Sequence, residues 1–387
     1  MFSKSALTVL GFLLGAVVVT VGVVQRNART PSPEMAAACE GGALRDVQAR
    51  QQALEDGYDI NRQYDCIDKA SFQAVQTQKK AWLAAQAERA QKTLADQTTQ
   101  AQLASMTLAQ ARQGFVTQVA HADANPLPLP TPPAAEFVRM DYTTADGLKL
   151  PAFVTPATKG GQRAPAIVWL TGGDSNSLDN FWIPGPPEND QTASAFRRAG
   201  VVMMFPVLRG GNGAGGSKQF FLGEVDDVLA AAKALALLPQ VDPAHIYLGG
   251  HSTGGTLALL TAEMGNNFRA VFALGPVGDV SLYGQNLVRI DFDRLAPLEA
   301  KLRSPLHWLH GIAQPTYLIE GKDQGNTDSL RTLCAAAASN PLVHCLQPAG
   351  FNHFSLIDAA ARQIAARMVQ AQMVGEFALS PDAFERR

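Results

Sequence analysis

The sequence is poor in charged residues, and the charges that it carries nearly cancel. Only 17% of its 387 residues are Asp, Glu, Lys or Arg, and the formal net charge is −2, whereas an average soluble domain has roughly 25% charged residues. Without a basic excess, the chain lacks the cationic surface that holds a polyanionic backbone. We therefore expect no nucleic acid among its partners.

Cysteine is also scarce, and the usual metal-binding patterns are missing. The four cysteines are too few for a dense disulfide scaffold, and neither H-E-x-x-H nor paired C-x-x-C occurs. We expect no metal and no other cofactor. By proximity Cys39 pairs with Cys66 and Cys334 with Cys345, which suits an oxidising compartment outside the cytoplasm. Four free thiols in a cytosolic protein are the alternative.

Charge is completely absent from residues 7–24. As a helix these 18 residues would span about 27 Å, close to the roughly 30 Å core of a bilayer. We predict that residues 1–30 form a single-pass membrane anchor, with a cleaved signal peptide as the alternative. Lys4 precedes the apolar run, while Arg26 and Arg29 follow it, so the charges leave its orientation open. The cysteine pairing favours a position outside the cytoplasm for the part of the chain that follows the anchor, in the periplasm if the cell is Gram-negative.

Residues 31–125 have the composition of a helical stalk. Ala and Gln make up 31 of the 81 residues from 40 to 120, and no proline occurs between Pro33 and Pro126. The spacing of apolar residues in this segment matches the heptad pattern of a coiled coil only weakly. Such a stalk would act as a spacer or as a homo-oligomerisation element, or it would pack as a helical region on the main domain. Five prolines in residues 126–133 then predict a semi-rigid linker, followed by a separate domain at 134–387.

Beyond the linker, short apolar runs alternate with helical patterns. The expected strands are residues 137–143, 148–155, 166–170, 201–207, 245–248, 270–274, 316–319 and 342–346. The clearest helical pattern covers residues 224–238, with acidic residues in its first turn. Buried strands that alternate with helices predict an α/β fold, in which a mostly parallel sheet of about eight strands has helices on both faces.

The sequence G-H-S-T-G-G at residues 250–255 lies between an expected strand and an expected helix. A sharp strand-to-helix turn holds a nucleophile in a strained conformation, and its neighbours must be small because adjacent backbone comes too close for a Cβ atom. At the helix N-terminus, backbone N–H groups can receive developing negative charge. We therefore predict that Ser252 is a catalytic nucleophile. An ordinary helix-capping serine is the alternative.

A serine nucleophile needs a base that is itself oriented by a carboxylate. His353 follows the last expected strand and precedes the last helix, and we predict that it is the base. Asp323, at the end of the penultimate strand, is the predicted acid because it preserves the order serine, acid, histidine. Asp279 is the main alternative, Asp328 caps the next helix or serves as the acid, and Glu320 is expected to end the strand.

The oxyanion hole is expected to consist of two backbone N–H groups. One belongs to Thr253, directly after the nucleophile. The other comes from the loop after the strand at 166–170, where Gly173 or Asp174 offers its N–H. We predict Gly173 for this role. The alternative is that the pair Gly172–Gly173 only allows the chain to turn.

The run G-x-G-x-x-G at residues 211–216 also matches the pattern of a dinucleotide-binding loop. The next strand, however, ends at the serine turn, where a dinucleotide fold would place its ribose-binding acid. No G-K-[ST] follows for a phosphate loop either. We therefore do not expect a nucleotide at this loop.

Residues 134–375 resemble the α/β hydrolase fold and, within it, the prolyl oligopeptidase type of catalytic domain and related bacterial esterases. The matching segments are 171–173 (TGG), 209–213 (RGGNG), 223–227 (GEVDD), 241–243 (VDP), 250–255 (GHSTGG), 303–305 (RSP) and 351–353 (FNH). Three features depart from the family pattern. Thr171 replaces the usual histidine before Gly-Gly, Asn352 replaces a glycine before the histidine, and the run at 321–323 (GKD) is one residue shorter than the common G-x-x-D.

Together these features predict a membrane-anchored serine hydrolase that cleaves a carboxylic ester or an amide bond through an acyl-enzyme intermediate. By analogy of fold, a small or medium ester is slightly favoured over a peptide. Phe181, Trp182 and the insertion at 281–312 are candidates for the walls of an apolar pocket. The alternative from another class is an envelope scaffold that assembles through the stalk, with a catalytically silent hydrolase domain.

Overall fold

The computed structural model describes residues 77–78, 80–91, 105–123, 126–157, 161–265, 268–283, 298–374 and 377–384. The chain divides into two compact units, Met1–Gln100 and Ala101–Arg387. In the first unit, residues 80–91 are helical, inside the segment whose composition predicts helix. The expected span at 7–24 and the pair Cys39–Cys66 lie outside the described residues. Within the described ranges, no helix combines the length and the apolar character needed to cross a bilayer.

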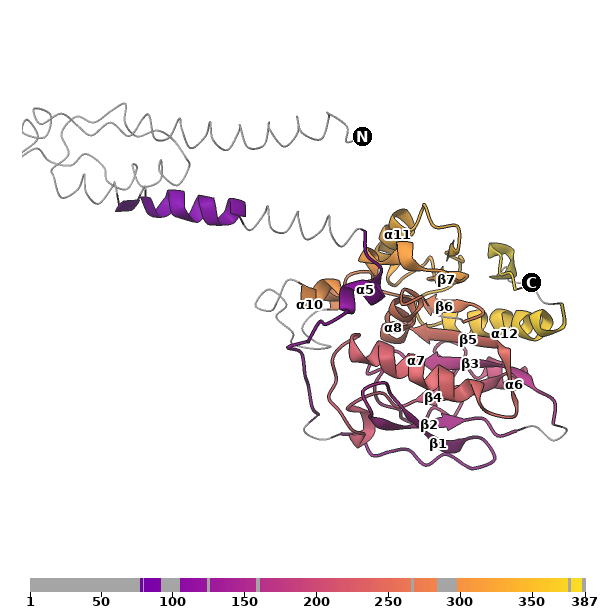
Figure 1. The fold of residues 1–387 in the computed structure, drawn as a ribbon. Helices are drawn as coiled ribbons and strands as arrows, with labels where there is room; N and C mark the ends of the chain where they lie inside the picture. Colours follow the sequence, from indigo (N-terminus) through magenta and orange to yellow (C-terminus); the bar gives the residue numbers. More distant parts are fainter. Residues whose placement is uncertain are drawn as a thin grey trace, which may run out of the picture. The chain divides into compact units, whose positions relative to one another are not determined.

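An eight-stranded sheet forms the centre of the second unit (Figure 1). Its strands are β1 (Val138–Thr143), β2 (Lys149–Val154), β3 (Ala164–Leu170), β4 (Val202–Pro206), β5 (Val241–His251), β6 (Val271–Leu274), β7 (Thr316–Ile319) and β8 (Val343–Leu346). They lie in the order β1-β2-β4-β3-β5-β6-β7-β8. The β1–β2 and β2–β4 pairs are antiparallel, and all other neighbours are parallel. The predicted mostly parallel sheet is confirmed.

Helices cover both faces of this sheet (Figure 1). The α-helices are α5 (Leu108–Arg112), α6 (Ala195–Arg198), α7 (Gly223–Ala236), α8 (Thr253–Ala262), α10 (Leu298–Lys301), α11 (Thr327–Ala336) and α12 (Leu356–Val374). Short 3₁₀ turns occupy Gly211–Gly213, Val280–Tyr283, Pro305–His307, Leu309–Gly311 and Pro381–Phe384. Successive strand residues point to opposite faces, so Val168 belongs to the core shared with α7 and α8, and Trp169 to the core shared with α6 and α12.

Residues 105–123 and 126–133, which we call the strap, pack onto the sheet-containing fold of the second unit. Leu108 is fully buried in one of the two cores. Arg112 pairs with Asp226 at 2.7 Å and donates to the Leu222 carbonyl at 3.0 Å. The proline-rich part is also held, since the Pro128 carbonyl accepts a hydrogen bond. The sequence divides these residues between a stalk and a linker, whereas their buried apolar and ionic contacts join them to the same compact unit as the sheet.

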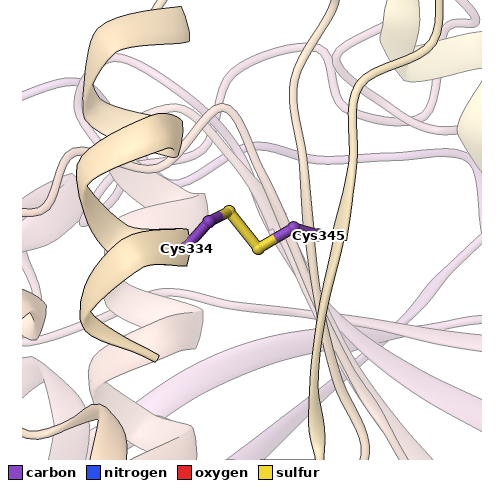
Figure 2. Close-up of a disulfide and its surroundings, with 2 residues drawn as sticks. All are labelled: Cys334 and Cys345. Carbon is purple, nitrogen blue, oxygen red and sulfur yellow. A yellow bond between two sulfur atoms is a disulfide. The ribbon is translucent and has the colours of Figure 1, made fainter. Parts of the chain in front are cut away.

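A disulfide joins Cys334 on α11 to Cys345 on β8 (Figure 2). This is the pairing predicted from the sequence, and it is confirmed. The bond ties the helix that follows β7 to the neighbouring edge strand. It thereby braces the edge of the sheet from which the chain continues toward His353.

Replacing both Cys334 and Cys345 by alanine should lower the free energy of unfolding by about 2–3 kcal/mol. The bond closes a loop of 11 residues, and a loop of that size restricts the unfolded chain by about this amount. Urea unfolding of the oxidised protein and the variant would measure the difference. Reductant should lower the free energy of unfolding of the wild type to that of the variant, and should leave that of the variant unchanged. A variant as stable as the oxidised protein would contradict this expectation.

Candidate active site

Ser252 lies at the sharp turn between β5 and α8. The strand ends at His251, the helix begins at Thr253, and Ser252 itself has φ 55° and ψ −116°. Residues other than glycine rarely adopt a positive φ, and backbone strain of this kind is concentrated at functional sites. The turn places Ser252 at the carboxyl end of a central strand, where open α/β sheets bind their ligands.

Glycines make this turn sterically feasible. A Cβ atom on Gly250 would lie 2.3 Å from the Gly254 carbonyl oxygen, and one on Gly254 would lie 2.3 Å from the Leu170 oxygen. A Cβ atom on Gly255 would lie 2.5 Å from the Leu274 oxygen. All three contacts are with backbone atoms, which cannot relieve a clash by changing rotamer as a side chain can. The small residues around Ser252 therefore allow β3, β6 and α8 to meet at the turn.

Glu320, rather than Asp323, lies against His353. Glu320 directly follows β7 and is fully buried. Its Oε2 lies 2.8 Å from His353 Nδ1 and also accepts a hydrogen bond from the Asn326 N–H at 2.8 Å. Its Oε1 accepts from the Gly321 N–H at 2.8 Å. The carboxylate is thus fixed by backbone donors and presents one oxygen to the imidazole.

Two glycines leave room for the pair formed by Glu320 and His353. A Cβ atom on Gly275 would lie 2.4 Å from His353 Cε1. A Cβ atom on Gly325, where φ is +140°, would lie 2.8 Å from Glu320 Oε2 and 2.9 Å from His353 Cβ. Gly275 follows β6, next to the strand that carries Ser252. The imidazole therefore lies against the backbone of the strand adjacent to the nucleophile.

Asp323 is exposed and contacts the histidine loop through its backbone and through a long side-chain hydrogen bond. Its N–H donates to the Phe351 carbonyl at 3.1 Å, and its Oδ1 accepts from the Gly350 N–H at 3.3 Å. One residue later, the Gln324 carbonyl accepts from the His353 N–H at 2.8 Å. Backbone hydrogen bonds around Asp323 thus join the loop after β7 to the loop that carries His353. The carboxylate of Asp323 itself is directed at Gly350.

The other candidate acids make local contacts. Asp279 accepts hydrogen bonds from the backbone and hydroxyl of Ser281. Asp328 pairs with Arg331 on the exposed side of α11. The sequence did contain a signal for Glu320: the run at 321–323 is one residue shorter than the family pattern. That shortening leaves the strand-ending Glu320 as the carboxylate within reach of the histidine.

His251, the residue before the nucleophile, contacts the back of the histidine loop. It is fully buried, and its Nε2 lies 2.9 Å from the His353 carbonyl oxygen. A carbonyl oxygen can only accept, so Nε2 carries the proton of this bond. Burial, with a smaller effect from nearby His353, lowers the pKa of His251 to about 3. His251 is therefore neutral near pH 7 and holds the His353 backbone.

This burial predicts how stability depends on pH. The pKa of His251 is about 3 in the folded protein and about 6.5 in the unfolded chain. Between these values the unfolded chain binds the extra proton, so the stability from this residue is complete above pH 6.5 and falls as the pH drops. The stability advantage of wild type over His251→Gln should shrink by about 1.4 kcal/mol per pH unit between pH 6 and pH 4. Urea unfolding at each pH measures this difference, and parallel curves would contradict the expectation.

The loop after β3 lies directly beside Ser252. A Cβ atom on Gly172 would lie 3.2 Å from Ser252 Cβ. The Gly172 N–H donates to Gln191 Oε1 at 3.2 Å, and the Thr253 hydroxyl donates to the Gly173 carbonyl at 2.9 Å. Gly173 has φ +76°, which glycine adopts readily. The two predicted oxyanion residues are thus joined by a hydrogen bond at the nucleophile.

A cavity of about 370 Å³ opens beside this loop. Its lining residues are Leu127, Thr171, Gly172, Asp174, Ser177, Leu178, Asp179, Asn180, Phe181, Gln191 and Thr192. Of the wall residues that the sequence predicts, Phe181 lines this cavity, whereas Trp182 and the described part of the insertion at 281–312 are not among its lining residues. Leu127 belongs to the strap, and the sequence analysis missed it because it treats residues 126–133 as a linker. Both apolar and polar side chains line the cavity, and its volume suits a small molecule or a side chain.

Known proteins match part of this chain. The model of the prolyl oligopeptidase family matches residues 187–303, which include Ser252 but end before Glu320 and His353. The chain is 28% identical over 209 residues to the "Uncharacterized peptidase YtmA" of Bacillus subtilis (strain 168), covering 50% of this chain and 77% of that protein. It is 27% identical over 195 residues to the "Dual function macrocyclase-peptidase POPB" of Galerina marginata, covering 44% of this chain and only 25% of that protein.

Among solved structures, the crystal structure of puromycin hydrolase superposes with a TM-score of 0.50 at 20% sequence identity. The match covers 65% of this chain and 42% of that one. At this identity the similarity establishes a shared fold.

Proposed function

We propose that this chain, which carries a prolyl oligopeptidase family domain on an α/β hydrolase fold, cleaves a carboxylic ester or an amide bond with Ser252, His353 and Glu320. The observation that supports this assignment best is the buried hydrogen bond between Glu320 and His353, formed next to the strained serine turn. Glu320 takes the role that the sequence analysis gives to Asp323. The chain order serine, acid, histidine is unchanged.

In the proposed reaction, Ser252 Oγ attacks the carbonyl carbon and its proton passes to His353 Nε2. Glu320 accepts from Nδ1, which fixes the tautomer and stabilises the imidazolium that forms. The negative charge on the carbonyl oxygen is received by the N–H of Thr253, at the N-terminus of α8, and by that of Gly173. His353 then protonates the leaving group and activates the water that releases the acyl group.

The scissile bond is an ester or an amide, and each has support. Both curated relatives are named as peptidases, which favours an amide or peptide bond. The cavity of about 370 Å³ also suits a small or medium ester. Turnover of p-nitrophenyl esters compared with Xaa-Pro anilides would decide between these classes.

Labelling by a fluorophosphonate probe tests the nucleophile. The wild-type protein should label, and Ser252→Ala should not. Ser281→Ala is a matched control, because Ser281 is exposed and hydrogen-bonded to Asp279; it should label like wild type. A wild-type protein that neither labels nor hydrolyses any ester or anilide would overturn the proposal and favour an envelope scaffold with a silent hydrolase domain.

We further propose that residues 7–24 anchor the chain in a membrane, with the catalytic unit outside the cytoplasm and the segment 31–125 as spacer or self-association element. The uncharged run is long enough to span a bilayer. The disulfide between Cys334 and Cys345 suits an oxidising compartment. Thiol alkylation in intact cells, with and without reductant, together with carbonate extraction of membranes, tests this placement. Freely reactive thiols in the cytoplasm, or complete release by carbonate, would contradict it.

A further inference from the structure

The strap is tied to the loop after β3 through one buried lysine. Lys218 is 7% exposed, and its Nζ lies 2.7 Å from Asp123 on the strap and 2.8 Å from Asp174 on the loop. Burial alone would lower the pKa of Lys218, but the two carboxylates outweigh burial and raise it. The lysine therefore stays charged. Asp174 directly follows Gly173, so two ion pairs through Lys218 connect the strap to the residue next to the predicted oxyanion residue.

The strap is fixed on both sides of Leu127. Before it, His121 and Lys218 exchange backbone hydrogen bonds of 2.9 and 2.8 Å. After it, Asn212 Nδ2 donates to the Pro128 carbonyl at 3.0 Å. These contacts leave residue 127 little freedom to withdraw from the cavity. A half-exposed leucine in a proline-rich segment thus has a defined position.

One side chain also positions the opposite wall of the cavity. Asn212 Oδ1 accepts from the Leu178 N–H at 2.7 Å, and its Nδ2 donates to the Leu178 carbonyl at 2.9 Å as well as to Pro128. Asn212 is buried and has φ 45°, a conformation that asparagine tolerates better than most residues. The side-chain amide of Asn212 therefore links the residue after Leu127 to the backbone of Leu178 on the opposite wall.

We propose that Leu127 is a specificity-determining residue, and that the strap limits the size of the apolar group that the cavity accepts beside the scissile bond. This proposal rests on the proposed hydrolase function. Thr171 and Gly172 line the same cavity, and a Cβ atom on Gly172 would lie 3.2 Å from Ser252 Cβ, so a group bound there lies near the nucleophile.

The charges of the cavity define the chemical class of that group. Two carboxylates line it, Asp174 and Asp179, and no lysine or arginine is among its lining residues. Lys218 balances Asp174. An anionic group would therefore meet the charge of Asp179, which forms no ion pair with the residues that the structure describes, whereas an uncharged aliphatic or aromatic group would bury surface against Leu127, Leu178 and Phe181.

Two substrate series test this proposal on the full chain. The p-nitrophenyl alkanoates from acetate to octanoate vary the acyl side, and the alkyl acetates from ethyl to octyl vary the leaving group. Each methylene that gains contact is worth about fourfold in kcat/KM. In whichever of the two series kcat/KM depends on chain length, Leu127→Trp should lower kcat/KM for the longest substrates about tenfold. For the shortest substrate of that series, kcat/KM should stay within twofold of wild type. Leu127→Ala should shift the optimum to longer chains.

Leu237→Ala is the matched control. Leu237 is 85% exposed and follows α7, at the edge of the sheet opposite the carboxyl ends of the parallel strands. It should leave the chain-length profile unchanged. The proposal would be overturned if kcat/KM of both Leu127 variants depended on chain length as in the wild type, or changed by the same factor at every chain length. The proposed hydrolase function would be unaffected by that result. A wild type without esterase or amidase activity would instead refute the proposed function.

Discussion

Replacing Glu320 by glutamine should lower kcat by about 10³- to 10⁴-fold and leave KM nearly unchanged. The amide keeps the shape of the side chain, but it presents no negative charge to His353 Nδ1 at the 2.8 Å contact. The imidazole then loses both the preference for the reactive tautomer and the stabilisation of the imidazolium. Steady-state kinetics on the best ester or anilide would measure the loss.

Asp323→Asn is the matched control for this prediction. Its carboxylate is exposed and accepts one long hydrogen bond from the Gly350 N–H, which an amide oxygen also accepts. Its contacts to the histidine loop are otherwise made by its backbone. We expect kcat within threefold of wild type. Equal losses for the two variants, or a larger loss for Asp323→Asn, would return the acid role to Asp323.

Replacing Arg303 by methionine should lower the free energy of unfolding by about 3–5 kcal/mol. Arg303 and Glu299 are both fully buried and form an ion pair. Arg303 also donates to the Gln219 carbonyl at 2.9 Å and to the Thr117 hydroxyl at 2.6 Å. The variant leaves the Glu299 carboxylate in the interior without its cation. Urea unfolding measured by circular dichroism would give the difference.

Arg331→Met provides the comparison for this loss. Arg331 forms an ion pair with Asp328 in which both side chains are mostly exposed, and such pairs contribute at most about 1 kcal/mol. The double variant Glu299→Met/Arg303→Met should recover part of the stability, because no buried charge remains unpaired. A loss in Arg303→Met no greater than in Arg331→Met would contradict the expected effect of the buried pair.

Much of the fold follows from local patterns in the sequence. All eight expected strands are present with boundaries within a few residues, except that β5 begins at Val241 instead of 245 and continues to His251. Continuous apolar runs bounded by Gly or Pro mark strands that are buried on both faces, and this signal does not depend on distant contacts. The strained turn at Ser252 is local in the same sense, because strand, small residues and helix follow one another directly.

The partner of His353 could not be obtained in this way. Glu320 and Asp323 are three residues apart in one loop, and both satisfy the order serine, acid, histidine. Which carboxylate reaches the imidazole depends on how this loop pairs with the histidine loop, through hydrogen bonds such as that from His353 N–H to the Gln324 carbonyl. It also depends on the space left by Gly275, which is far away in sequence.

The sequence by itself determined an α/β fold and a strand-to-helix turn with Ser252 at its apex, and it favoured the pairing of Cys334 with Cys345, because each depends on residues close together in the chain. Tertiary structure decided that Glu320 contacts His353 and that the proline-rich segment lies against the cavity. Proline composition predicts an extended backbone but not the surface on which that backbone lies. That surface is selected by buried partners such as Lys218 and Asn212, roughly 90 residues away in the sequence and brought to the strap only by folding.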